Sequence, residues 1–409
     1  MLPFGVNLIS TFGRPYSITY LAFSLADALI KRGVPISLSN VLLGKNEERI
    51  LRQDLRPYLV PARAEAMKHP INLLVLPAMA VKEMMTLLTR HDGLVSRKMH
   101  VTNLWWELTK LPLEVEQDLK RFDVVLTHSD FLAHLARTSA PHTHVINSPL
   151  SWRVDDTIAP NRQRFNFPEG ATVYLFAFDA DSEKYTIDAE TGNGRKNPLE
   201  LIDTFLRAFP DAQTNVHLAI RATHIEKPDH AVLLNRLENL VQRDPRIQLV
   251  KGAMDFTDVM TLTASCDVYV SLHRAEGFGL GMLEAMAFGK PVIATAWSGN
   301  MSFLDSTNAC LVRYELEPLS DSYRYHNLAL PPGTLWAKPS AEDAIAYMRR
   351  LHQDKGFTEL LGRNARLSYK TYQAQAEREK WIDELYLHWK MFDTLPKIAG
   401  KYSSSQKPA

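Results

Sequence analysis

Short apolar segments of strand character alternate with segments of helical spacing along most of the chain. The first series begins with FGVNLIS at residues 4–10, continues with a helical pattern from Ile18 to Leu29, and ends with HVINSPL at residues 144–150. Strands separated by helical patterns predict a parallel sheet with helices on its faces. The chain is therefore expected to be an α/β protein.

A second series of the same kind begins with TVYLFAFDA at residues 172–180 and continues to PVIATAWS at residues 291–298. Residues 151–170 between the two series carry prolines and glycine but no clear period, which is typical of a domain boundary. We therefore expect two Rossmann-like, doubly wound domains, residues 1–155 and 156–370. Residues 371–400 are expected to form C-terminal helices that pack back towards the first domain, and residues 401–409 a disordered tail.

Two local expectations concern the second domain. Asn197 is expected to cap a helix that has Pro198 at its first position. The proline-rich stretch from Leu316 to Thr334 is expected to be a long loop.

Composition limits the partners and the compartment. The 409 residues carry a formal net charge of +1, which argues against a nucleic-acid partner by bulk charge. The two cysteines, Cys266 and Cys310, cannot build a disulfide framework or a zinc site, and we interpret them as buried hydrophobic residues in a cytoplasmic protein. The N-terminus does not resemble a signal peptide, and no apolar run approaches the roughly 18 residues of a membrane span, so membrane contact would be peripheral, at the inner face.

The segment SLHRAEGFGLGMLEAMAFGKPVIATAWSGN, residues 271–300, carries the chemistry. A glycine-rich turn follows an apolar strand and opens a helix, and ligands of open α/β sheets bind at such strand ends. A helix N-terminus also favours a phosphate. The glycines alone are a weak signal, because strand–helix packing could require them. A dinucleotide fingerprint is rejected, because the third glycine is at the wrong spacing and the next strand ends without an acidic residue.

Two glutamates, Glu276 and Glu284, flank this turn with seven residues between them, so both can face one crevice. The stretch from Glu276 to Ala294, EGFGLGMLEAMAFGKPVIA, strongly resembles the E-x7-E motif of retaining GT-B glycosyltransferases of the GT4 type, the glycosyltransferase group 1 family. The resemblance is firm over residues 172–312 and thinner in the first third. It implies a GT-B fold, in which two Rossmann-like domains face each other across a cleft.

The resemblance implies how a nucleotide-diphosphate sugar would bind. Glu284 would bind the ribose, and Glu276 would face the donor sugar and help to stabilise its cationic form. Backbone amides of the turn would hold the sugar and the diphosphate: Gly277, Phe278, Gly279 and Leu280. No metal site and no cofactor is implied, since the nucleotide sugar is a substrate. Without the motif, Glu284 would be a solvated helix residue.

Positive charge must stabilise the departing diphosphate. Lys196 matches the phosphate-binding lysine of the family, with Arg195 beside it, although an ordinary exposed loop pair is the alternative. The family usually places a further basic residue just after the preceding strand, where this chain has Phe178-Asp179. Arg221 and Arg274, both at predicted strand ends, are candidate substitutes.

The acceptor is expected to enter from the first domain, where four candidates lie at predicted strand ends or turns: Gly13, Arg14, Glu107 and Ser129. Glu107 is either an acceptor-side carboxylate or a buried ion-pair partner, and Ser129 is also a plausible N-cap. Trp105 and Trp106 could pack or stack on sugar. Asp179, Asp181 and Glu183 resemble a metal-binding cluster but are interpreted as a polar loop.

The resulting hypothesis is a metal-independent, retaining glycosyltransferase. It would move a sugar from a nucleotide-diphosphate donor to a glycan, lipid-linked glycan or protein acceptor in the synthesis of a polysaccharide or other glycan. The alternative is a catalytically silent GT-B subunit of a glycan-assembly complex, which binds a nucleotide sugar. A weaker third option is another GT-B reaction, such as epimerisation or phosphorolysis.

Overall fold

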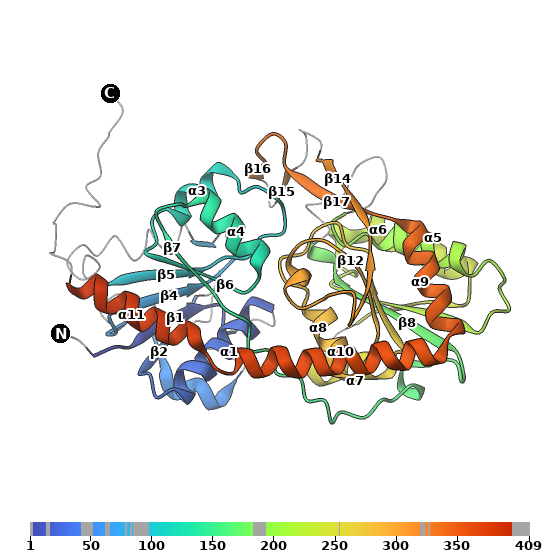
Figure 1. The fold of residues 1–409 in the computed structure, drawn as a ribbon, viewed down its shortest axis with the longest axis horizontal. Helices are drawn as coiled ribbons and strands as arrows, with labels where there is room; N and C mark the ends of the chain where they lie inside the picture. The colour runs from blue at the N-terminus through green and yellow to red at the C-terminus, as the bar shows by residue number, and fades with distance from the viewer. Residues whose placement is uncertain are drawn as a thin grey trace.

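The computed structural model describes residues 3–13, 17–41, 52–61, 66–77, 80–81, 84, 98–182, 194–252, 254–319, 324–325 and 328–394. Arg14, Glu183 and the tail 401–409 lie outside these residues. Figure 1 shows two lobes side by side, each with a sheet between helices.

The first lobe is built on a seven-stranded sheet in the order β3-β2-β1-β4-β5-β6-β7, in which the paired strands run parallel. β1, β2, β4 and β5 are buried along their whole length, as expected for strands covered on both faces. The strands are β1 (Val6–Ser10), β2 (Ile36–Asn40), β3 (Leu59–Val60), β4 (Ile71–Val75), β5 (Met99–Asn103), β6 (Val124–Thr127) and β7 (His144–Asn147).

The second lobe has a six-stranded parallel sheet in the order β10-β9-β8-β11-β12-β13. The strand order reverses between β8 and β11, and ligands of doubly wound sheets bind at such a point. The expected α/β fold with two Rossmann-like domains is thus confirmed. The strands are β8 (Thr172–Asp179), β9 (Val216–Thr223), β10 (Ile247–Val250), β11 (Val268–Ser271), β12 (Val292–Thr295) and β13 (Cys310–Val312).

Helices cover both sheets. The α-helices of the two lobes are α1 (Ser17–Lys31), α3 (Leu113–Leu119), α4 (Asp130–Ser139), α5 (Pro198–Ala208), α6 (Ala231–Arg243), α7 (Phe256–Ser265), α8 (Leu280–Ala287) and α9 (Ala341–Gln353). The 3₁₀ helices are η1 (Gln53–Tyr58), η3 (Gln163–Phe165), η4 (Ala180–Ser182), η5 (Pro228–His230) and η6 (Gly299–Ser302). Among the described residues, no helix combines the length and the hydropathy needed to cross a bilayer.

The N-terminus of α5 differs from the expectation. Asn197 occupies the N-cap position, but its side chain makes no capping bond because its backbone is left-handed, with φ of 63°. Its amide instead donates to Glu200 Oε2 and to the carbonyl of Leu272, at 3.0 Å each. The side chain therefore ties α5 to the end of β11.

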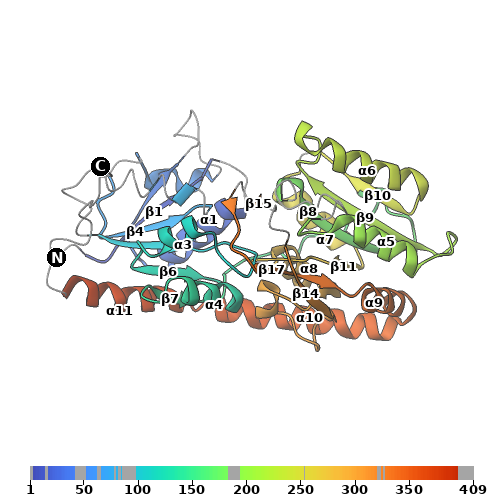
Figure 2. The same ribbon diagram turned by 90° about the horizontal axis from the view of Figure 1, so that it is seen from above.

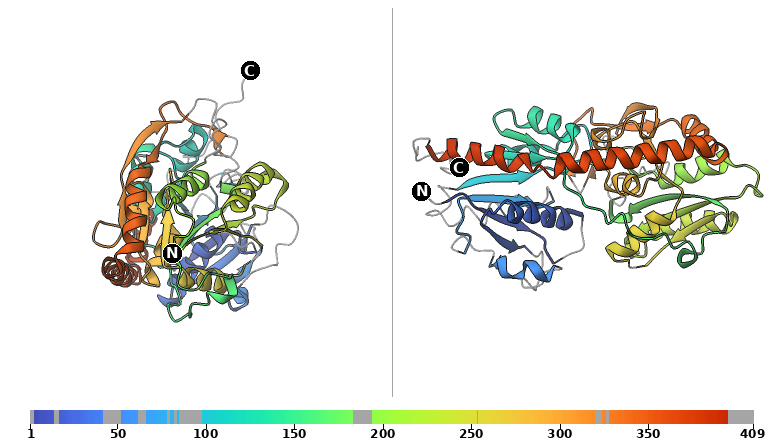
Figure 3. Two further views of the ribbon diagram at one scale, coloured as in Figure 1. Left: turned by 90° about the vertical axis from the view of Figure 1, so that its right-hand side faces the viewer. Right: turned by 60° about the horizontal axis from the view of Figure 1, so that its bottom comes forward.

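Two C-terminal helices, α10 (Lys355–Ala376) and α11 (Lys380–Thr394), run along both lobes, as Figures 2 and 3 show from two directions. α10 packs against α8 and α9, and α11 packs against β7. In the first lobe, the ring of Phe4 packs against the rings of Tyr386 and Trp389, with distances of 5.1 and 5.6 Å between ring centroids. α11 thus belongs to the surface of the first lobe, although it follows the second in sequence.

The stretch from Leu316 to Thr334 was expected to be a long loop, and the structure corrects this in part. Its first residues are the end of β14 (Tyr314–Pro318), which pairs antiparallel with β17 (Leu335–Pro339). The rest of the stretch connects these two strands and carries, among its described residues, the small pair β15 (Arg324–Tyr325) and β16 (Leu328–Ala329). The pair of β14 and β17 reaches the first lobe, where the amide of Leu335 donates to Thr109 Oγ1 at 2.7 Å. The prolines of the stretch lie at the last residue of β14, Pro318, and in the connection before β17, at Pro331 and Pro332.

Candidate functional site

The glycine-rich turn leads from β11 into α8. α8 begins at Leu280, and Gly279 holds the N-cap position with φ of 101°, a left-handed conformation that glycine adopts without steric cost. Because Gly279 has no side chain, the N-cap residue makes no side-chain bond to the first amides of the helix. This helix N-terminus therefore suits an anionic ligand.

Lys196 and Arg195 converge on Glu276. Lys196 Nζ forms a close ion pair with Glu276 Oε2, and Arg195 Nη1 lies 4.0 Å from Glu276 Oε1. Burial opposes ionisation of Glu276, but the charges of Lys196 and Arg195 outweigh it and lower the pKa of the carboxyl to about 2. The three residues thus form a buried charged cluster, so Lys196 and Arg195 are not an exposed loop pair.

Glu107 links this cluster to the first lobe. Its Oε1 lies 3.3 Å from Arg195 Nη2, and both side chains are largely buried. Of the two interpretations of Glu107, the structure supports the ion-pair partner. Arg195 also donates to the carbonyl of Ala275 at 3.3 Å, which fixes its guanidinium against the turn.

Glu284 lies on α8 and is buried. Its Oε1 accepts a hydrogen bond from Trp152 Nε1 at 3.1 Å. Burial raises the pKa of Glu284 to about 7, and the bond from Trp152 offsets only part of this rise. Burial raises the pKa of the Tyr269 phenol on β11, and the charges of Glu284 and Glu276 raise it further. Both glutamates therefore lie near Tyr269. The two glutamates are thus brought together around the part of the second lobe's sheet that carries Tyr269.

Ser298 and Gly299 hold the backbone of Glu276, a role that the sequence did not reveal. Ser298 Oγ accepts from the amide of Glu276 at 3.1 Å, and the amide of Gly299 donates to the carbonyl of Glu276 at 2.9 Å. A Cβ at Gly299 would lie 2.0 Å from the carbonyl oxygen of Gly277, so only glycine allows this approach. The tripeptide SGN was visible in the sequence, but the residue that it holds, Glu276, lies 22 positions before Ser298.

Arg221 and Arg274 were candidates to replace the basic residue that the family usually places where this chain has Phe178-Asp179, but both side chains have other partners. Arg221 is buried and donates to the carbonyls of Val250 and Gly252, at 3.3 and 2.9 Å. Arg274 pairs closely with Glu317, and its guanidinium lies 4.2 Å from the ring centroid of Trp336. None of these contacts involves Lys196 or Glu276.

On the acceptor side, Ser129 is the N-cap of α4, as expected, and accepts from the amide of Leu132 at 3.2 Å. It also donates to the carbonyl of Gly277 at 2.9 Å, which joins α4 to the glycine-rich turn. Gly13 is buried after β1. Trp106 is buried too, and its indole donates to the carbonyl of Lys110, so it packs rather than presenting a sugar-stacking face.

Asp179, Asp181 and His224 lie at the ends of β8 and β9, with potential ligand atoms within 4.8 Å of one another. The carboxylates already have partners: His224 Nδ1 lies 2.9 Å from Asp179 and His230 Nε2 lies 2.8 Å from Asp181, while Lys227 pairs closely with Asp181. Among the described residues this group could hold a cation, but its contacts are those of a structural ion-pair network.

Comparison with known proteins supports the interpretation of the second lobe. Residues 192–321, which include Lys196, Glu276 and Glu284, match the family described as Glycosyl transferases group 1. An uncharacterized glycosyltransferase of Methanocaldococcus jannaschii is 31% identical over 102 residues, which are 25% of this chain and 27% of that protein. The chain thus matches only about a quarter of the length of this curated relative.

Solved structures resemble nearly the whole chain. Sucrose-phosphate synthase from Thermosynechococcus elongatus has a TM-score of 0.66 at 18% identity, over 94% of this chain and 99% of that one. A glycosyltransferase from Rickettsia africae has a TM-score of 0.65 at 12% identity, over 96% and 100%. Anabaena HepE in complex with UDP-glucose has a TM-score of 0.63 at 13% identity, over 94% and 99%. The chain therefore has the GT-B fold, and together with the group 1 segment this supports a glycosyltransferase.

Proposed function

We propose that this protein is a retaining glycosyltransferase of the GT4 type that takes its sugar from a nucleoside diphosphate. The observation that carries the proposal is the cluster of Lys196, Arg195 and Glu276 beside the glycine-rich start of α8, inside the segment that matches the group 1 family. HepE binds UDP and UDP-glucose, which supports a nucleotide sugar as donor.

Transfer breaks the bond between the anomeric carbon and the diphosphate, so negative charge grows on the leaving group. Lys196, Arg195 and the amides at the start of α8 would stabilise that charge, with no need for a metal ion. Glu276 stays ionised at physiological pH because its pKa is about 2, so it can face the positive charge that develops on the sugar. Glu284 would accept hydrogen bonds from the ribose.

The acceptor side and the cell location belong to the proposal as well. The acceptor, a glycan, lipid-linked glycan or protein, would enter from the first lobe past Gly13, Arg14, Glu107 and Ser129. Closure of the lobes would exclude water and suppress hydrolysis of the donor. We place the enzyme in the cytoplasm, with peripheral membrane contact where the acceptor is lipid-linked. The resemblance to a synthase and to transferases does not favour a silent subunit.

The test begins with a thermal-shift panel of GDP-, UDP-, ADP- and dTDP-sugars, because a ligand of the native state raises the apparent stability. Turnover of the sugar that binds is then measured as donor hydrolysis and transfer, with and without EDTA. We expect Lys196→Ala and Glu284→Ala to abolish turnover while the fold is retained, and EDTA to leave turnover unchanged. Normal turnover in both variants would overturn the site assignment, and loss in EDTA would overturn metal independence.

A further inference from the structure

Trp152 lies in the segment that connects the two lobes, 132 positions before Glu284, and the residue is 5% exposed. The indole Nε1 donates to Glu284 Oε1 at 3.1 Å. We propose that Trp152 is a positioning residue: it holds one oxygen of the Glu284 carboxylate and so directs the other towards the ribose hydroxyls of the donor. This inference rests on the proposed function, in which Glu284 binds the ribose.

The backbone on both sides of Trp152 is fixed by two tyrosines of α10. The amide of Leu150 donates to Tyr372 Oη at 2.8 Å, and the amide of Val154 donates to Tyr369 Oη at 3.0 Å. The hydroxyl of Tyr369 donates in turn to the carbonyl of Trp152 at 3.2 Å. Because these bonds lie before, at and after Trp152, the indole is presented from a rigid support rather than from a free linker.

Aromatic packing fixes the orientation of the ring. The Trp152 ring meets Tyr20 of α1 at 6.5 Å with an interplanar angle of 82°, and Phe256 of α7 at 6.1 Å with an angle of 75°. Both are edge-to-face contacts, a preferred geometry for aromatic pairs. Both lobes therefore contribute to the orientation of the N–H.

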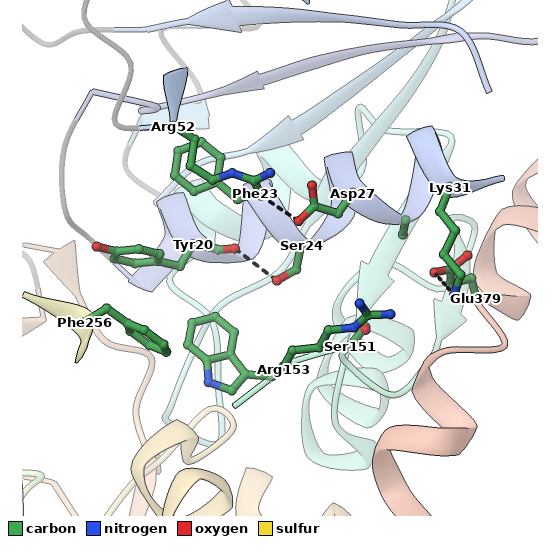
Figure 4. Close-up of a pocket in the computed structure, with 12 residues that line it drawn as sticks. Tyr20, Phe23, Ser24, Asp27, Lys31, Arg52, Ser151, Arg153, Phe256 and Glu379 are labelled. Atoms are coloured by element: carbon green, nitrogen blue, oxygen red, sulfur yellow. Dashed lines mark hydrogen bonds and ion pairs between the residues drawn. The ribbon is translucent and has the colours of Figure 1, made fainter. Parts of the chain in front are cut away.

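Trp152 also lines a cavity of about 310 Å³ between α1 and the connecting segment. Figure 4 shows Tyr20, Ser24 and Phe256 around this cavity, and Arg52 reaching Asp27 at its edge. A small side chain in place of Trp152 would enlarge the cavity and disturb the packing. A large ring without an N–H, as in Trp152→Phe, is therefore the variant that isolates the hydrogen bond.

The chemistry of an indole suits this role. Its N–H is only a donor and is uncharged, so it can anchor a carboxylate without neutralising it. An ionised carboxylate accepts hydrogen bonds from sugar hydroxyls with both oxygens, whereas the protonated acid has lost part of this capacity. Burial favours the acid form of Glu284, and the bond from Trp152 is the described contact that lowers its pKa. Trp152 would thus support both the orientation and the ionisation that ribose recognition needs.

The experiment measures ribose recognition directly. UDP, GDP and ADP and their 2′-deoxy counterparts are titrated calorimetrically into the full chain, and the ratio of the deoxy to the ribo Kd is determined. Hydrogen bonds to a charged group predict a ratio of roughly 10 to 100 for the wild type. We expect Trp152→Phe to lower this ratio at least about threefold. The matched control is Trp389→Phe, a buried tryptophan that packs on Phe4, which should leave the ratio unchanged.

The outcomes separate the inference from the proposed function. If no nucleotide binds, or if Glu284→Gln leaves the ratio unchanged, the proposed function fails. If Glu284→Gln removes the preference but Trp152→Phe keeps it, or weakens both ligands equally, the positioning role of Trp152 alone is overturned. A crystal structure of the wild type with the bound nucleotide decides the matter if Trp152→Phe does not fold. Trp152 Nε1 must then remain within hydrogen-bonding distance of Glu284, and an indole that has left the carboxylate refutes the inference.

Discussion

The ion pair between Lys196 and Glu276 can be tested by a double-mutant cycle of Lys196→Met and Glu276→Gln. Both side chains are largely buried, with 16% and 13% of their surface exposed. Lys196→Met leaves a buried carboxylate with Arg195 as its remaining described cation, at 4.0 Å. Glu276→Gln leaves a buried ammonium, whereas the double variant removes both charges. The cycle therefore isolates the pair.

The structure gives the order of magnitude. The pKa of Glu276 falls from an ordinary 4.5 to about 2 although burial opposes ionisation, which corresponds to about 3 kcal/mol in favour of the carboxylate. Lys196 contributes the largest charge effect in this balance. We therefore expect Lys196→Met to destabilise the fold by about 2–3 kcal/mol at pH 7, within the range for a broken buried pair. Because the folded pKa lies below the unfolded one, this stabilisation is complete above pH 4.5 and is lost as the pH falls towards 2.

The assay is urea unfolding of the wild type, the two single variants and the double variant at pH 7, monitored by circular dichroism. The pair between Lys227 and Asp181 serves as a control, because its side chains are 47% and 36% exposed and its coupling should stay below about 1 kcal/mol. We expect a coupling energy of at least about 1 kcal/mol for Lys196 and Glu276, larger than that of the control. A coupling energy no larger than that of the exposed pair would refute the inference that Lys196 and Glu276 form a buried ion pair.

Three further predictions concern other parts of the site. Nucleotide binding should strengthen as the pH rises through about 7, where Glu284 becomes ionised, and Glu284→Gln should show no such rise in calorimetric titrations across pH 6–8. Gly299→Ala should lower the Tm strongly, because its Cβ would lie 2.0 Å from the carbonyl of Gly277, whereas Gly356→Ala on α10 should leave Tm unchanged or slightly higher. Ser129→Ala removes a helix cap and a bond between the lobes, and should cost about 1–2 kcal/mol in urea unfolding.

Much of the fold could be predicted because its signals are local. Strands such as β1, β4 and β11 are short, mostly apolar segments that are buried along their length, and the glycine-rich turn is recognisable from its own residues. The prediction of a loop from Leu316 to Thr334 missed the end of β14 for the opposite reason. That strand depends on pairing between Tyr314–Pro318 and Leu335–Pro339, which local composition does not encode.

The site was harder to predict than the fold, because its side chains are fixed by distant partners. Arg274 was a candidate for the phosphate, yet Glu317 and Trp336 hold its guanidinium. Those partners lie 43 and 62 positions later, in the paired strands β14 and β17. Trp152 had no motif to mark it, since its importance arises only when Glu284 is brought against it. Pattern reasoning identified the charged groups but could not assign their partners.

The contacts across the two lobes suggest why the glycosyltransferase motif is so long. Its first part is reached from the first lobe: Ser129 donates to the carbonyl of Gly277. The second glutamate of the motif, Glu284, accepts a hydrogen bond from Trp152 of the connecting segment. If the lobes separated, the bond from Ser129 would break and the turn would lose this support, whereas Trp152 is held by α10, which packs against α8. In the proposed function, the turn is therefore fully supported only while the lobes are closed, which is also the state that would exclude water from the activated sugar.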